Sequence, residues 1–102
     1  MFEYKSSGSE GSSNRVIITV LGKDKVGIIA GVSVVLAENN VNILDISQTI
    51  LQDMFTMVMV CDITYCKVEF GALKDRLEGK GREIGVQIQV QHEDVFKFMH
   101  RI

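Results

Sequence analysis

Cysteine, positive charge and long apolar runs are all scarce in this sequence. It has two cysteines in 102 residues, and Cys61 and Cys66 lack the close pairing of a redox or zinc motif, so we interpret both as reduced and structural. The net charge of −2 argues against nucleic acid as a partner, because phosphate binding depends on a basic patch. Each apolar run is far too short to span a bilayer, and no secretory signal opens the chain. We therefore expect a cytoplasmic protein with no membrane and no nucleic-acid partner.

The remaining composition fits one globular domain. The chain is 46% apolar and has the usual length of a single packed unit. The stretch SSGSEGSS, residues 6–13, has no apolar periodicity and cannot offset the entropy of being ordered. We expect residues 1–13 to be a disordered tail, native or appended, and residues 14–102 to form one domain.

From Asn14 onward, strand and helix patterns alternate. Strands are predicted where residues are β-branched or alternate in polarity, and helices where apolar residues recur three or four apart. Four strands are predicted, over 15–21, 41–51, 54–64 and 84–91, with a turn at Gln52 and Asp53 between the second and the third. A helix between the first two strands carries Ile28, Ile29, Val32, Val35 and Leu36. A second helix, between the last two strands, carries Phe70, Leu73 and Leu77 and is expected to end at Gly79–Gly81. The tail is expected to add one or two turns of helix, with Val95, Phe96 and Met99 packing on the body.

This order predicts an α+β fold: a ferredoxin-like βαββαβ sandwich with a four-stranded antiparallel sheet, two helices on one face and a short C-terminal helix. The first and third strands would be central, and both are apolar on both faces. The outer strands carry polar residues on one face, namely Gln87, Gln89 and Gln91 on the fourth strand and Asp45, Ser47 and Thr49 on the second.

The sheet face away from the helices would thus have an apolar centre. Such a centre is usually covered by another protein surface, or the sheet edges pair across a two-fold axis, so we expect a homodimer at least. The alternative is a monomer whose tail helix covers this face with Phe96, Phe98 or Met99.

The loop GKDKVGIIAG, residues 22–31, contains the glycines that a bound ligand would need. Gly22 and Gly27 have Walker A spacing, but Ile28 and Ile29 replace the residues that meet phosphate and magnesium, and no GxGxxG is present. Nucleotide binding is therefore disfavoured, and no cofactor is expected.

A carboxylate suits this loop better than a phosphate. The residues from Gly27 begin a helix, so unpaired N–H groups and the positive end of the dipole face the loop. Asp24 offers an acceptor for an ammonium group, and the amide of Asn42 offers both a donor and an acceptor. These groups together predict a site for a free amino acid. The alternatives are that Asp24 caps the helix, that Asn42 is a turn residue, and that Lys23 and Lys25 are simply solvated rather than steering an anion.

The segment GKDKVGIIAGVSVVLAENNVNILDIS, residues 22–47, resembles the motif of ACT domains. These are small regulatory modules whose pattern runs Asp-Arg-Pro-Gly, an amphipathic helix and a Val/Ile-Asn-Ile strand. The resemblance extends from about Val16 to the end of the chain. It is closest to short stand-alone ACT proteins of bacteria and archaea and is also similar to ACT regulators of glycine cleavage.

The resemblance implies a βαββαβ fold, dimers made by pairing sheets or helices, and amino acids bound between subunits. By this resemblance, Asp24 and Gly27 match the loop positions, and Asn42 matches the asparagine that reaches a ligand from the neighbouring subunit. The full expected ligand-binding set is Asp24, Lys25, Val26, Gly27, Ile28, Asn42 and Ile43. Val26 stands where better-known members have proline, so the loop is expected to be less rigid.

Catalysis and metal binding have weaker support in the sequence. No nucleophile lies beside a base and no carboxylate pair is placed for a cleft, so we predict that the protein is not an enzyme. His92, Glu93, Asp94 and His100 could ligate a metal, but the gap between the histidines does not place them on one helix face, and Glu93 and Asp94 read more simply as charge at a helix start. Two hypotheses remain: an amino-acid-binding dimer that modulates an unknown partner protein, and an interaction module with no small ligand.

Overall fold

The computed structural model describes residues 14–99; the predicted tail over 1–13 and His100 lie outside the described residues, as do the side chains of Phe98 and Met99. Seven elements follow one another: β1 (Arg15–Lys23), α1 (Ile28–Glu38), β2 (Asn42–Leu51), β3 (Met54–Asp62), α2 (Phe70–Ile84), β4 (Gln87–His92) and α3 (Glu93–Met99). The predicted α+β, ferredoxin-like order is confirmed, including the short last helix. Within residues 14–99, no helix is long and apolar enough to cross a membrane.

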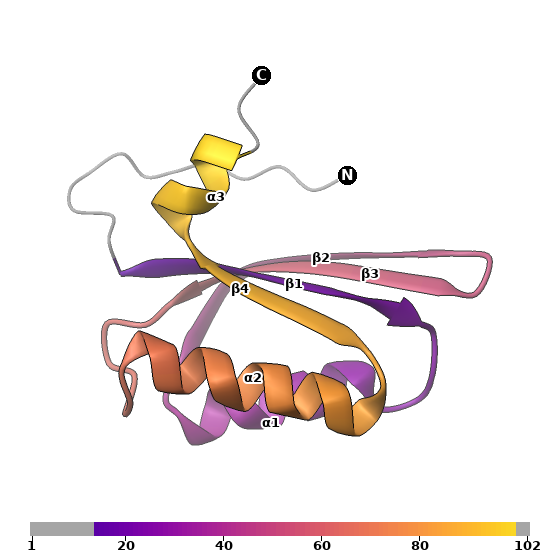
Figure 1. The fold of residues 1–102 in the computed structure, drawn as a ribbon, viewed down its shortest axis with the longest axis horizontal. Coiled ribbons are helices and arrows are strands. Elements are labelled where there is room, and N and C mark those ends of the chain that lie inside the picture. Colours follow the sequence, from indigo (N-terminus) through magenta and orange to yellow (C-terminus); the bar gives the residue numbers. More distant parts are fainter. Residues whose placement is uncertain (1–13, 100–102) are drawn as a thin grey trace.

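The four strands form one antiparallel sheet in the order β2-β3-β1-β4, so the first and third strands are central as predicted. Helices α1 and α2 lie together on one face, and α3 stands on the opposite face (Figure 1). We call these the inner face and the outer face. The predicted turn at Gln52 and Asp53 joins β2 to β3, and Gln52 adopts a positive φ of 59° there.

The core lies between the inner face and the two helices. Alternate residues of the central strands point inward and are fully buried: Val16, Ile18 and Val20 of β1, and Met57, Met59 and Cys61 of β3. The helices close this layer with Val32, Leu36, Leu73 and Leu77, each 1% exposed or less. The helical spacing read from the sequence is therefore right, except that Ile29 is 39% exposed and faces away from the core.

Helix α2 continues through the glycines that were expected to end it. A Cβ on Gly81 would come within 2.7 Å of the Val86 carbonyl oxygen, so this glycine allows the helix to lie close against β4. The helix ends at Gly85, whose φ of 82° is left-handed and whose N–H donates to the Gly81 carbonyl. The prediction of a stop at Gly79–Gly81 is wrong because one glycine serves packing and a later one serves as the cap.

All four strands differ from the prediction at a boundary: β2 begins one residue later, at Asn42, and β4 is Gln87–His92 instead of 84–91, because α2 extends to Ile84. Strand β1 continues through Gly22 and Lys23. Strand β3 ends at Asp62 instead of Thr64, because the Asp62 carboxylate accepts hydrogen bonds from the Thr64 N–H at 2.9 Å and from its hydroxyl at 2.6 Å. These bonds turn the chain out of the sheet and lower the pKa of Asp62.

Strand β2 is the least covered part of the sheet. None of its ten residues is buried. The register with β3 shifts between Ile43 and Asp45, which leaves Leu44 as the extra residue of a bulge. After this bulge Ile46, Gln48 and Ile50 join Ile43 on the inner face, whereas the polar residues Asp45, Ser47 and Thr49 lie on the outer face, as predicted.

The outer face is covered at one end only. Ile17 and Val60, which pair toward one end of the central strands, are 1% and 2% exposed, and α3 lies on this side of the sheet (Figure 1). Leu21 and Met54, at the other end, are 39% and 46% exposed. The tail helix thus stands on this face and packs against β1 and β4, while its covering of the face by Phe96, Phe98 or Met99 stays a prediction. Val95 does not pack on the body as expected, because it is 48% exposed.

Candidate functional site

The candidate site begins where β1 passes into α1. Gly27 precedes the helix with φ 96°, a left-handed conformation that strains any residue with a Cβ. The first intrahelical bond in this turn runs from the Gly31 N–H to the Gly27 carbonyl at 2.9 Å. The N–H groups of Ile28, Ile29 and Ala30 therefore have no helical acceptor, and no side-chain hydrogen bond caps the helix. The alternative in which Asp24 caps α1 is wrong, because Gly27 occupies the cap position.

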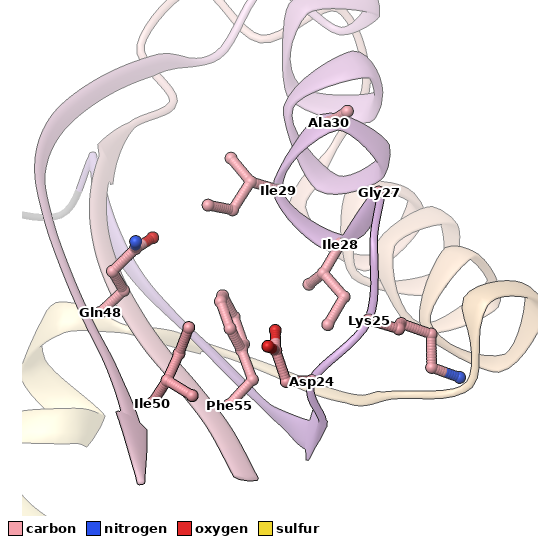
Figure 2. Close-up of a pocket in the computed structure, with 9 residues that line it drawn as sticks. All are labelled: Asp24, Lys25, Gly27, Ile28, Ile29, Ala30, Gln48, Ile50 and Phe55. Atoms are coloured by element: carbon pink, nitrogen blue, oxygen red, sulfur yellow. The ribbon is translucent and has the colours of Figure 1, made fainter. Parts of the chain in front are cut away.

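An open cavity of about 220 Å³ lies against this helix start. Its walls come from four places: the loop, the first turn of α1, the inner face of β2, and β3 (Figure 2). The lining residues are Asp24, Lys25, Gly27, Ile28, Ile29, Ala30, Gln48, Ile50 and Phe55. Four members of the predicted set, Asp24, Lys25, Gly27 and Ile28, are thus brought together.

Asp24 and Lys25 point in different directions. The Asp24 carboxylate is exposed and points into the cavity beside Phe55, while the Lys25 chain runs away from it (Figure 2). The Lys25 Nζ lies 2.7 Å from the place where a Cβ on Gly85 would be. Lys25 therefore sits at the C-terminal end of α2, where a positive charge is favourable, and its ammonium does not face the cavity.

The backbone of Asp24 holds the loop in place. Its N–H donates to the carbonyl of Asp53, in the β2–β3 turn, at 2.7 Å. This bond fixes the loop to the hairpin, so the Asp24 side chain keeps its position opposite the start of α1.

Three other residues of the predicted set lie outside this cavity. Val26 is fully exposed. Asn42 and Ile43 are at the start of β2, paired with Asp62 and Cys61, whereas the cavity is lined by the end of that strand. In one chain, the asparagine and the loop are therefore separated by the length of β2. The prediction that Asn42 reaches a ligand from a neighbouring subunit stays a prediction.

Sequence reasoning missed Gln48, Ile50 and Phe55. Phe55 was assigned to the correct strand, but its position beside the loop depends on the hairpin register. Gln48 lies opposite Met57 on the inner face only because of the bulge at Leu44. The amide of Gln48 points across the cavity toward Ile29, so it adds a donor and an acceptor to the wall (Figure 2).

The cysteines and the tail lie away from the cavity. Burial raises the pKa of the Cys61 thiol to about 12, which keeps it protonated, and this agrees with its interpretation as a small buried hydrophobe. In the tail, the His92 ring stacks on Phe70 with centroids 4.0 Å apart, and Glu93 and Asp94 lie in the first turn of α3. Within the part of the chain that the structure describes, no group of three or more metal-ligating side chains is found.

The family follows from the comparison with known proteins. The ACT domain family model matches residues 14–91, which span all of β1 to β4 apart from the last residue of β4. The chain belongs to the ACT domain family. The resemblance read from residues 22–47 is thereby confirmed.

Individual relatives support the same assignment. A UPF0237 protein from Methanocaldococcus jannaschii is 60% identical over 89 residues, covering 87% of this chain and 99% of the relative. The solved ACT domain protein from Streptococcus pneumoniae is 44% identical, with a TM-score of 0.71 over 81% of this chain and 93% of that one. A solved glycine cleavage system transcriptional repressor shares the fold at 12% identity, with a TM-score of 0.69 over 86% of this ACT domain and 51% of the repressor.

Proposed function

We propose that this ACT domain is a cytoplasmic regulatory module that binds a free amino acid, or a similar small zwitterion, between two copies of the chain and so modulates a partner protein. The observation that carries the proposal is the composition of the cavity wall. Uncapped N–H groups at the start of α1 and the exposed carboxylate of Asp24 line the same space. An α-carboxylate binds the first and an α-ammonium binds the second.

The apolar part of the wall provides for the ligand's side chain. Ile29, Ile50 and Phe55 border the cavity, and Ile29 and Ile50 are 39% and 50% exposed. Apolar side chains left open beside a few polar groups are typical of small-molecule sites. This arrangement supports a ligand with an uncharged side chain.

The exposed strand β2 supports a dimer. Ile43, Ile46 and Ile50 are 37–50% exposed although they continue the inner face. Two copies related by a two-fold axis perpendicular to β2 would place these strands antiparallel, so the start of one would lie beside the end of the other. Asn42 of the second copy would then approach the cavity of the first, which is the role that the resemblance gives it.

Regulation requires that the ligand distinguish two states of the assembly. A ligand that binds the dimer but not the separated chains shifts the population toward the dimer, whereas one of equal affinity shifts nothing. The regulatory role is supported by the family and by the transcriptional repressor that shares this fold.

The test is a thermal-unfolding panel of the free amino acids. One amino acid is expected to stabilise the wild type, by about 2.7 kcal/mol when present at 100 times its Kd. Asp24→Ala and Asn42→Ala should lose this stabilisation. Asp53→Ala is the matched control, because it removes a nearby exposed carboxylate that does not line the cavity, and it should respond as the wild type does.

The second candidate is an interaction module without a small ligand. Only the exposed apolar residues of β2 favour it. If no amino acid stabilises the wild type, and sedimentation equilibrium still shows a dimer that Ile46→Ser weakens, this second function replaces the first. A monomer at all concentrations would contradict both versions of the dimer.

A further inference from the structure

A glutamate is buried without a hydrogen bond to any described residue, at the opposite end of the molecule from the cavity. Glu93 opens α3 and is 1% exposed. Neither of its carboxylate oxygens has a hydrogen bond within the part of the chain that the structure describes. The Arg15 Nη1 is 3.8 Å from Oε2, which is an ion pair but too long for a hydrogen bond. A carboxylate in such a place is costly to ionise.

The charges around Glu93 do not remove this cost. Loss of hydration on burial raises the pKa of Glu93, the nearby charge of Lys97 lowers it, and that of Asp94 raises it further. Arg15 is shared, because it also lowers the pKa of Asp62 from the neighbouring strand. Among the described residues, the charged and titratable groups around Glu93 are Arg15 on β1, His92 beside it in the chain, and Asp94 and Lys97 on α3 itself; Asp62 of β3 pairs with Arg15.

Helix α3 is attached over a small area. It has seven residues and, among the described elements, packs mainly against β1 and β4. Ile17 of β1 and Val60 of β3 pair with each other and are buried, although they are on the face opposite α1 and α2. Helix α3 stands on this same face of the sheet (Figure 1). A helix of this length is not stable alone in water, so it exists only while it is docked.

We propose that α3 is a detachable cover of the outer face, docked while Glu93 is protonated and released when Glu93 ionises. The protonated acid can stay beneath the helix at modest cost, whereas the carboxylate is more stable in water. Release is a local unfolding of α3 that exposes Ile17 and Val60 and leaves the core on the inner face intact. This device is independent of the ligand proposed above.

The direction of the pH effect follows from the raised pKa. The docked state binds the proton more tightly than the released state does. Docking is therefore strongest below the ordinary pKa of glutamate, about 4.3, and weakens as pH rises through the raised value. Between these two pKa values the docking constant falls by up to about tenfold for each pH unit.

The test is methyl NMR of the full chain between pH 4 and pH 8. The Ile17 and Val60 methyl signals are expected to shift with one common midpoint above pH 4.3, and α3 amide protection should fall over the same range. Ile18, which faces the core on the inner side, should not follow. In Glu93→Gln, which mimics the neutral acid, the Ile17 and Val60 signals should stay at their docked positions throughout.

Asp94→Asn is the matched control: it removes an exposed carboxylate from the next position of the same helix, and with it a charge that raises the Glu93 pKa, so the titration should persist with a midpoint slightly below that of the wild type. A titration that persists in Glu93→Gln would belong to another group and would overturn the proposal. So would constant Ile17 and Val60 signals in the wild type. A carboxyl-carbon titration of wild-type Glu93 gives a check without any variant: a midpoint at or below 4.3 would also overturn it.

Discussion

Strands β1 and β2 flank β3 on opposite sides and share its inner face, but they differ in what covers them. The inward residues of β1, Val16, Ile18 and Val20, are fully buried beneath α1 and α2. The inward isoleucines of β2, Ile43 and Ile46 among them, are more than a third exposed. The comparison shows that the core is complete without β2, whose side chains are left for the cavity and for the proposed contact with a second copy.

The sharpest test of this comparison uses one residue type on both sides of Met59. Ile18 of β1 and Ile46 of β2 are the two cross-strand neighbours of that methionine. Ile18→Ala removes a fully buried side chain and leaves a cavity, so we expect a loss of about 2–5 kcal/mol in the free energy of unfolding, measured by urea denaturation. A loss below that range would mean that β1 is no more important to the core than β2.

A second prediction concerns the hydrogen bonds of Asn39, which link helix α1 to helix α2. Asn39 is buried at the end of α1, where its amide N–H donates to the Val35 carbonyl at 2.7 Å and its side-chain oxygen accepts a hydrogen bond from Arg76 of α2. Asn39→Ala removes both bonds, and we expect a loss of about 1–3 kcal/mol in unfolding free energy.

Arg76→Ala supplies the partner for a double-mutant cycle with Asn39→Ala. Because Arg76 is exposed, its own loss should be smaller, and the two changes should be less than additive. Full additivity would show that the hydrogen bond between Asn39 and Arg76 contributes no free energy to the packing of α1 and α2 over β1.

The smallest effect is expected on β2. Ile46→Ala removes a side chain that is 43% exposed, so the unfolding free energy of the separated chain should fall by about 1 kcal/mol or less. The dimer should weaken by more than this, as measured by sedimentation equilibrium. Equal losses for Ile18→Ala and Ile46→Ala would erase the distinction between the two strands.

Much of the fold could be predicted because the central strands are apolar on both faces and the outer ones are not. That pattern places β1 and β3 in the middle of the sheet without any knowledge of contacts. The end of α2 could not be predicted, since Gly81 and Gly85 look alike in sequence, and only the packing against Val86 and the left-handed φ tell them apart.

The part of the candidate site that the loop contributes could be predicted from the sequence. Asp24, Gly27 and the start of α1 are neighbours in the chain, so their chemistry can be read directly from the sequence. The contribution of Gln48 depends on a bulge at Leu44, and that of Phe55 depends on the pairing of β2 with β3. Such long-range register leaves no local pattern, and the place of Asn42 depends on a second molecule.

The bond from the Asp24 N–H to the Asp53 carbonyl ties the loop mechanically to the tip of the hairpin. A displacement of the loop is therefore passed to the residues that flank this turn, Leu51 and Met54, which are 72% and 46% exposed. The hairpin tip is thus linked to the loop by this bond and by the pairing of Lys23 with Met54, so a molecule bound beside Asp24 lies against the segment that positions the tip.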